Sequence, residues 1–216
     1  MRIMFPFIFL ILLSPHIFVE YQVQTYVSNC TFDYLILEEV DNVNPNGTFT
    51  FTLYTVFLNS SEISNSTMLD NLTCPKAFFY IPSVGKEVIN RGITLTLLNK
   101  TGDYFVYTGY TFLSYVGLRY YYYVNSSGVP SKIIICQFSV TNGKVVSKSY
   151  YKLISSNIIN SSEKPIIPSE LKPFSGEKIS FSSLNDTLGS YIVLLNLFII
   201  PAVVIFKVIR HEKDHR

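Results

Sequence analysis

TFTFTLYTVF, from Thr48 to Phe57, alternates threonine with apolar residues along most of its length. A period of two is typical of a β-strand with one buried face, because successive side chains point to opposite sides of a sheet. ITLTLL, from Ile93 to Leu98, repeats this pattern. Aromatic and β-branched residues mark seven further predicted strands: Tyr21–Val27, Thr31–Leu37, Ala77–Ile81, Tyr104–Phe112, Ser114–Val124, Ile133–Thr141 and Lys144–Ile154.

Turn signals separate the predicted strands, namely NPNG at 44–47, NKTGD at 99–103 and SSGVP at 126–130. This number of short strands predicts an all-β fold, and we expect a single antiparallel β-sandwich over residues 21–155. The expected architecture resembles that of immunoglobulin domains. The chain departs from them because it has no tryptophan, and because Ile134 stands where the tyrosine before the second cysteine would be.

The stretch FSVTNGKVVS predicts a β-hairpin. Asn142-Gly143 favours a two-residue type I′ turn, because both central positions of that turn have positive φ. Such a turn would place Cys136 opposite Ser149. The residues then expected on the core side are Ile134, Cys136, Phe138, Val140, Val145 and Tyr151.

The N-terminal segment has the dimensions of a signal peptide. One basic residue precedes the apolar run Ile3–Leu13, which is too short to span a membrane alone. We assign residues 1–20 to this signal and expect cleavage between Ser14 and Thr25. The alternative is an uncleaved anchor that extends to Val19.

A second apolar run, Leu188–Phe206, predicts a transmembrane helix, since its nineteen residues at about 1.5 Å each cover about 28 Å. The tail at 207–216 has an excess of cations, which predicts a cytoplasmic C-terminus and type I topology. Residues 156–187 are rich in proline and serine and are expected to form a stalk, the alternative being an edge strand at Lys178–Phe181. Asn196 could bond a second helix within the membrane.

Acceptor triplets for N-glycosylation occur nine times. They are used only on exposed chain in the secretory lumen, so they indicate the same compartment as the signal segment. The triplets at 59, 65 and 71 recur every six residues, and we expect that stretch to be an exposed loop. We expect glycans at Asn46, Asn59, Asn65, Asn71, Asn99, Asn125 and Asn160, with weaker acceptors at Asn29 and Asn185.

Three cysteines, Cys30, Cys74 and Cys136, lie in the predicted lumenal part, where thiols are oxidised. Three pairings are possible. The loop length favours a disulfide between Cys74 and Cys136, as a bridge between the two sheets of the expected sandwich. Cys30 would then be left over, either buried or bonded to a second chain.

The distribution of histidine excludes several chemistries. His16 lies in the predicted signal segment, and the other two lie in the tail, at His211 and His215. A mature domain without histidine excludes Ser-His-Asp and Cys-His sites and disfavours a structural zinc site. We interpret the densest acidic cluster as the solvated end of a strand: Glu38, Glu39 and Asp41. We therefore expect no catalysis, no cofactor and no bound metal.

The stretch GLRYYYYV contains four consecutive tyrosines after an arginine. Alternate tyrosines on a strand would face opposite sides of the sheet. Exposed tyrosine and arginine are favoured anchors in protein interfaces. The candidate partner face therefore consists of Arg119, Tyr120, Tyr121, Tyr122 and Tyr123. The alternative is a strand that is covered on both faces.

Together these patterns predict a type I single-pass membrane glycoprotein at the cell surface that recognises another surface protein without catalysis. A composition rich in Asn, Ile, Tyr and Phe without Trp favours an AT-rich source, such as a virus-encoded immune modulator. The alternative is a minor virion envelope glycoprotein, a structural subunit of a hetero-oligomer joined through Cys30 or Asn196. Residues 20–187 carry twelve Lys or Arg and thirteen Asp or Glu, a net charge of −1, and this balance gives no sign of nucleic-acid binding.

Overall fold

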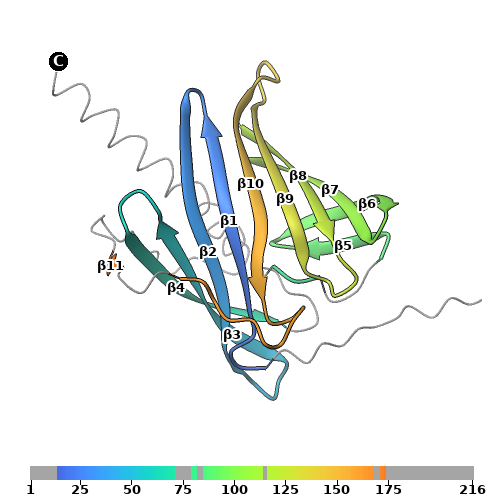
Figure 1. Ribbon diagram of the computed structural model, residues 1–216. Coiled ribbons are helices and arrows are strands. Elements are labelled where there is room, and N and C mark those ends of the chain that lie inside the picture. Colours follow the sequence, from blue (N-terminus) through green and yellow to red (C-terminus); the bar gives the residue numbers. More distant parts are fainter. Residues whose placement is uncertain (1–13, 72–78, 82–84, 114–115, 168–170, 174–216) are drawn as a thin grey trace, which may run out of the picture. The chain divides into compact units, whose positions relative to one another are not determined.

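The computed structural model describes residues 14–71, 79–81, 85–113, 116–167 and 171–173 (Figure 1). Contacts divide the chain into two units, Met1–Gly176 and Glu177–Arg216, and all described residues belong to the first. They form strands and no helix, which confirms the all-β prediction. Accordingly, no helix in the described ranges could cross a membrane, and the predicted span at 188–206 lies outside those ranges.

Within the described ranges, eleven strands make a single sheet. Their bounds are β1 (Phe18–Val27), β2 (Cys30–Val43), β3 (Thr48–Phe57), β4 (Glu62–Asn71), β5 (Glu87–Asn90), β6 (Ile93–Thr101), β7 (Tyr104–Leu113), β8 (Val116–Val124), β9 (Pro130–Ser139), β10 (Val145–Ser156) and β11 (Lys172–Pro173). The order across the sheet is β11-β4-β3-β2-β1-β10-β9-β8-β7-β6-β5.

Two meanders, β1–β4 and β5–β10, are therefore joined side by side where β1 pairs with β10 (Figure 1). All neighbouring strands are antiparallel except the short β11, which is parallel to β4. Because hydrogen bonding is continuous across the sheet, the predicted sandwich of two sheets with immunoglobulin-like architecture is not confirmed.

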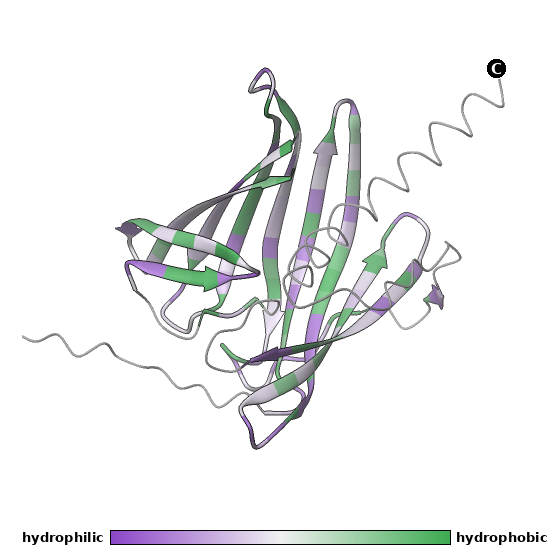
Figure 2. Ribbon diagram, turned by 180° about the vertical axis from the view of Figure 1, so that it is seen from behind, coloured by the Kyte–Doolittle hydropathy of each residue, from purple (hydrophilic) through white to green (hydrophobic). Residues whose placement is uncertain are grey.

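Alternation along β3 follows the pattern in the sequence. Phe49 and Phe51 are fully buried on what we call the inner face of the sheet, and Thr50 and Tyr54 are half-buried on the opposite, outer face. Figure 2 shows apolar and polar residues succeeding one another along the strands. The inner face is filled by large aromatic side chains from both meanders: Tyr21, Phe49, Phe51, Tyr107, Tyr120, Tyr122 and Tyr151.

The stretch predicted to be an exposed loop with three acceptor triplets is largely a strand. Residues 62–71 form β4, which pairs with β3 along its whole length. Met68 lies opposite Phe51, so the polar strand still contributes one apolar residue to the inner face. The predicted strand Ala77–Ile81 is not one in its described part, since residues 79–81 have no strand conformation.

A buried ion pair shows how strongly the sheet curls. Arg91 Nη1 lies 2.7 Å from Glu38 Oε1, and the two side chains are 2% and 0% exposed. Glu38 is on β2 and Arg91 lies between β5 and β6. β2 and β6 are six strand positions apart, which in a flat sheet would be about 29 Å. The inner face is therefore folded onto itself, and Glu38 is not the solvated residue that we predicted.

The hairpin between β5 and β6 explains why Arg91 reaches inward. Asn90 pairs with Ile93, which leaves a two-residue turn of Arg91 and Gly92. Their φ values are +52° and +71°, the pattern of a type I′ turn. A left-handed arginine costs about 1–2 kcal/mol, so the ion pair holds a conformation that arginine does not favour.

The hairpin between β9 and β10 differs from its prediction. Only Gly143 of the Asn142-Gly143 pair has positive φ, and the Gly143 N–H donates to the Ser139 carbonyl across a longer loop. Cys136 consequently lies opposite Lys148 instead of Ser149. A slip of one residue exchanges the two faces of a strand. The inner-face residues of β9 are Ile133 and Ile135, whereas Ile134, Cys136, Phe138, Val140 and Val145 are not in the core.

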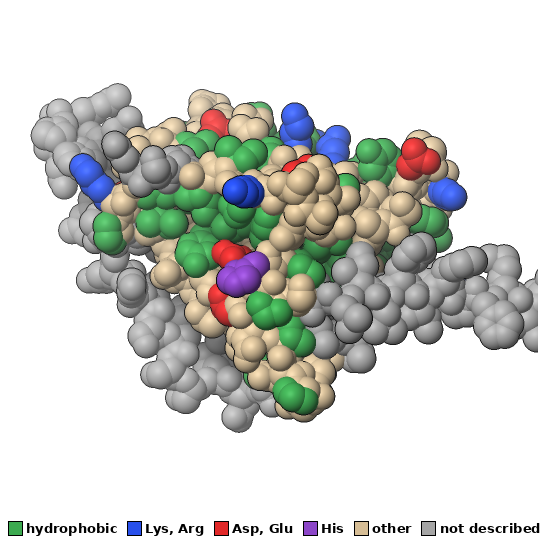
Figure 3. All heavy atoms as spheres, turned by 60° about the horizontal axis from the view of Figure 1, so that its bottom comes forward, with side chains coloured by type: hydrophobic (Ala, Val, Ile, Leu, Met, Phe, Trp, Pro, Cys, Tyr) green, Lys and Arg blue, Asp and Glu red, His purple; other side chains and the backbone are tan. Residues whose placement is uncertain are grey.

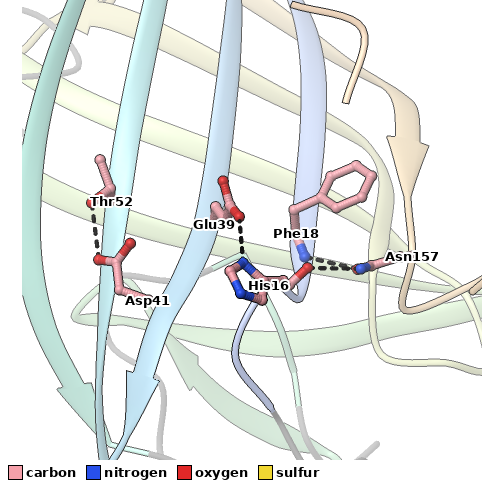
Figure 4. Close-up of polar contacts among 6 residues, drawn as sticks. All are labelled: His16, Phe18, Glu39, Asp41, Thr52 and Asn157. Atoms are coloured by element: carbon pink, nitrogen blue, oxygen red, sulfur yellow. Dashed lines mark hydrogen bonds and ion pairs between the residues drawn. The ribbon is translucent and has the colours of Figure 1, made fainter. Parts of the chain in front are cut away.

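Residues 16–18 are clamped between β2 and the turn after β10 (Figure 4). The His16 N–H donates to the Val40 carbonyl, and Val40 donates back to Ile17, both at 2.8 Å. Asn157 donates to the His16 carbonyl and accepts from the Phe18 N–H, again at 2.8 Å each. These bonds continue β1, in which Phe18–Glu20 are buried, so the predicted signal boundary at residue 20 falls inside a central strand.

The first part of the predicted stalk packs on the sheet. The Ile166 N–H donates to Glu20 Oε2 at 2.8 Å, and Lys172 N donates to the Ser61 carbonyl at the β4 edge at 3.0 Å. The described parts of this segment thus contact Glu20 of β1 on the outer face and the edge of β4. The outer-face residues Glu20 and Leu37 are buried, and burial raises the pKa of the Glu20 carboxyl.

The clamp at residues 16–18 predicts where a signal peptide is removed. We expect cleavage after Ser14 or Pro15, because a later cut would delete hydrogen bonds of β1 and buried residues that follow them. Mass spectrometry of the mature protein, purified from cells that process it in the secretory pathway, should find an N-terminal peptide that begins at Pro15 or His16. A mature chain that starts at Tyr21 or later would contradict the role given to this clamp.

The buried ion pair predicts a strongly coupled pair of substitutions. Glu38→Gln should lower the free energy of unfolding by about 3–5 kcal/mol, because it leaves a buried guanidinium without its counter-ion. The double variant Glu38→Gln/Arg91→Met should lose much less unfolding free energy than the two single variants lose together, as measured by urea unfolding. Glu87→Gln, an exposed carboxylate on β5, is the control and should change stability by less than about 0.5 kcal/mol. Additive effects would contradict the pairing.

Candidate functional site

The four tyrosines of β8 divide between the two faces of the sheet. Tyr120 and Tyr122 are 1% and 0% exposed on the inner face, and burial raises the pKa of both phenols. Tyr121 and Tyr123 are half-buried on the outer face, beside the exposed Arg119. The predicted alternation is confirmed, and Tyr120 and Tyr122 are removed from the candidate partner face because they lie in the core.

Strand register arranges the outer face around β8 in three rows. The first row, from β7 to β1, is Tyr110, Arg119, Cys136, Lys148 and Tyr26. The second is Thr108, Tyr121, Ile134, Tyr150 and Gln24. The third is Val106, Tyr123, Lys132, Lys152 and Gln22. We call the β8–β10 part of these rows the outer patch.

Aromatic rings lie next to the cations of the outer patch. The Arg119 guanidinium lies 4.8 Å from the Tyr110 ring centre, Lys148 Nζ 4.8 Å from that of Tyr150, and Lys132 Nζ 5.3 Å from that of Tyr123. Cation–π contacts of this kind hold the cationic groups over the sheet instead of leaving them free in solvent. The outer patch is therefore an ordered surface of rings and charges.

The cations of the outer patch have no acidic neighbours on their own strands. None of the residues of β8, β9 and β10 is Asp or Glu. On the same face, Asp33 of β2 lies in the row of Tyr150, two strands further on. Hydrogen bonding to Tyr121 raises the pKa of Arg119, and hydrogen bonding to Tyr150 raises that of Lys148, so both remain cationic at neutral pH.

Two of these cations are placed directly against each other. Lys132 on β9 and Lys152 on β10 are register partners, and both are exposed. Like charges at opposed positions on adjacent strands are destabilising. Neither residue makes a salt bridge to any residue of the described ranges. The sheet therefore keeps an uncompensated charge repulsion at this position.

The described acceptor asparagines gather mainly on the first meander. Five belong to β1–β4 or its turns, and strands β7 to β10 contain no asparagine. Seven are exposed and one, Asn125, is half-buried in the β8–β9 turn: Asn29, Asn46, Asn59, Asn65, Asn71, Asn99, Asn160 and Asn125. Asn185 lies outside the described residues. Two of them border the outer patch, since Asn99 pairs with Val106 in the row of Tyr123 and Asn125 is in the β8–β9 turn. The strands of the patch themselves carry no acceptor.

Three acceptors share one local geometry. In each, the amide oxygen accepts hydrogen bonds from both the backbone N–H and the hydroxyl of the residue two positions on. The hydroxyl distances are 2.7 Å in Asn46–Thr48, 2.5 Å in Asn125–Ser127 and 2.8 Å in Asn160–Ser162. This is an Asx-turn arrangement, in which the side-chain oxygen stands in for a backbone carbonyl. The amide nitrogen, which would carry the glycan, donates no hydrogen bond to any described residue at these three sites.

Two cysteines are described, and both are free thiols. Cys30 is exposed at the start of β2, and Cys136 is half-buried in the outer patch between Arg119 and Lys148. Cys74 lies outside the described residues, so the structure does not show the predicted Cys74–Cys136 bridge. The described strands form one continuous sheet, so there are no two separate sheets for such a bridge to join.

The acidic cluster is divided among three roles. Glu38 is buried, as described above, and Asp41 accepts a hydrogen bond from Thr52 at 2.9 Å. Glu39 lies 3.2 Å from Nδ1 of His16, whose side chain is 85% exposed (Figure 4). Figure 3 shows this histidine at the surface with acidic side chains beside it. The described fold therefore contains a histidine, which the sequence had placed with the signal segment.

Sequence reasoning missed both partners of the ion pair and the outer cations. Arg91-Gly92 between the alternating stretches EVIN and ITLT is a hairpin signal that would have revealed the turn. Lys132, Lys148 and Lys152 gave no signal, because only the register between β8, β9 and β10 brings them together.

Comparisons with known proteins do not identify the chain. No family model matches it, and no curated protein matches it. Among solved structures, a candidate AttH protein from Nitrosomonas europaea is similar at 6% identity and a TM-score of 0.28, covering 64% of this chain. The chain spans 49% of that structure's length. A TM-score this low does not indicate a shared fold.

The exposed Asx-turns predict which acceptors are used. In the full chain expressed in eukaryotic cells, removal of N-glycans should increase gel mobility, and Asn46→Gln or Asn160→Gln should each remove one step of that shift. Asn142→Gln, at an exposed turn asparagine outside any triplet, should change nothing. If glycosidase treatment left the gel mobility of the chain unchanged, this result would contradict the lumenal location.

Proposed function

We propose that the chain is a type I single-pass membrane glycoprotein, which serves as a non-catalytic recognition module at the cell surface. The signal segment, the apolar run at 188–206 and the acceptor triplets support this topology from the sequence. A virus-encoded modulator of host recognition fits the AT-rich composition.

The observation that carries the recognition role is the separation of two surfaces. Acceptor asparagines gather on the first meander, whereas the outer patch on the second has none within its strands. The patch presents Arg119, Tyr121 and Tyr123 to solvent, and tyrosine and arginine are enriched among residues that dominate binding energies. A surface of this composition, with no acceptor on its own strands, supports contact with a partner.

The alternative role, a structural subunit of a viral envelope hetero-oligomer, is favoured by one observation. Cys30 is exposed at the β1–β2 turn, where its thiol is accessible to a second chain. This reading and the first share the same topology, and they differ in whether the outer patch or Cys30 is required.

The recognition role predicts a defined effect of β8 substitutions. Cells that display the full chain should bind a panel of fluorescently labelled target cells, and Tyr121→Ala/Tyr123→Ala should reduce this binding at least tenfold. These side chains are half-buried, so the variant should still reach the surface at normal levels, as measured with an antibody to an added tag.

Tyr54→Ala is the matched control, since Tyr54 is a half-buried outer-face tyrosine on β3, among the predicted glycans. Equal binding by the β8 variant and the parent chain would contradict the choice of face. A covalent dimer on non-reducing gels that Cys30→Ser abolishes, without any cell binding, would favour the envelope role instead.

A further inference from the structure

We propose that the outer patch binds a sulfated polysaccharide chain of the kind displayed on animal cell surfaces. This inference rests on the proposed function, because it requires the patch to face the extracellular side. Its basis is the arrangement of Arg119, Lys132, Lys148 and Lys152 around a central row of Tyr121, Ile134 and Tyr150.

The first step is the sign of the charge that the patch can accept. Four cations lie on three adjacent strands that contain no acidic residue. Lys132 and Lys152 oppose each other directly, an arrangement that an anion placed between them would turn from unfavourable to favourable. The ligand is therefore anionic.

The second step is the size of the ligand. Arg119, Lys132 and Lys152 are exposed and Lys148 is half-buried, so no single cation is enclosed enough to bind a small anion strongly. The two cationic rows are four residues apart along the strands, or about 14 Å. Affinity must come from many weak contacts made at once over this distance, which a polymer with repeated charges provides.

The third step distinguishes a polysaccharide from an acidic protein. Three of the four cations are lysines, and lysine is depleted in protein interfaces, whereas clusters of lysine and arginine are typical of heparin-binding patches. The row between the cations contains Tyr121 and Tyr150, half-buried on the outer face, where aromatic side chains can pack against sugar rings while the flanking cations face sulfates. In contact with a polysaccharide, the cations of the outer patch can also keep part of their hydration.

The inference predicts salt-dependent binding of heparin by the full chain. Purified in a nonionic detergent, the protein should bind immobilised heparin at the physiological ionic strength of about 0.15 M. Lys132→Ser/Lys152→Ser should raise the Kd for heparin about tenfold or more. The plot of log K against log salt concentration should also become less steep by about two, one for each lost contact. The same variant should unfold at an equal or higher temperature, because it relieves the opposed charges.

Lys86→Ser/Lys100→Ser is the matched control, since it removes the same charge from exposed positions outside the patch, before β5 and on β6. It should leave heparin binding within twofold of the parent chain. Equal loss in both variants, or no binding of heparin by the parent chain, would overturn the inference.

Target cells treated with heparinase separate this inference from the proposed function. Loss of binding to treated cells is the expected result. Binding that persists on treated cells and still depends on Tyr121 and Tyr123 would show a protein partner, which overturns the polysaccharide and keeps the recognition role. A chain that never reaches the cell surface, tested by surface labelling, would refute the proposed function itself.

Discussion

The ion pair between Glu38 and Arg91 is the contact on which the closed inner face depends. It joins β2 to the β5–β6 turn, two places that a flat sheet would hold far apart. The Phe79 N–H donates to the second oxygen of Glu38 at 2.7 Å, and the Arg91 guanidinium lies 3.8 Å from the Phe79 ring centre. One carboxylate thus fixes two distant segments at a fully buried position.

Burial would normally make such a pair costly, since both charges lose hydration. Desolvation raises the pKa of Glu38 even with Arg91 beside it. The cost is offset by the aromatic packing that closure allows, in which Tyr21 and Tyr151 contact Phe79 edge to face. The two meanders share one core for this reason, although strand pairing joins them only at β1 and β10.

Local patterns predicted the strands well and their partners poorly. The alternation in Thr48–Phe57 and in Tyr120–Tyr123 follows from side-chain geometry within one strand, and both were confirmed. The β9–β10 register depended on one turn, and a longer loop followed by a bulge shifted it by one residue and exchanged the faces. The polar strand β4 and the cations of the outer patch are defined by neighbours distant in sequence, which periodicity does not reveal.

The seam between β1 and β10 also sets the order in which the sheet can assemble. Val19 pairs with Ser156, so the central ladder joins the two ends of the folded chain, whereas every other long ladder joins consecutive strands. Loop closure over such a separation is slow compared with hairpin formation. Each meander can form as a local unit, but the first must wait for the last long strand before its open edge is covered.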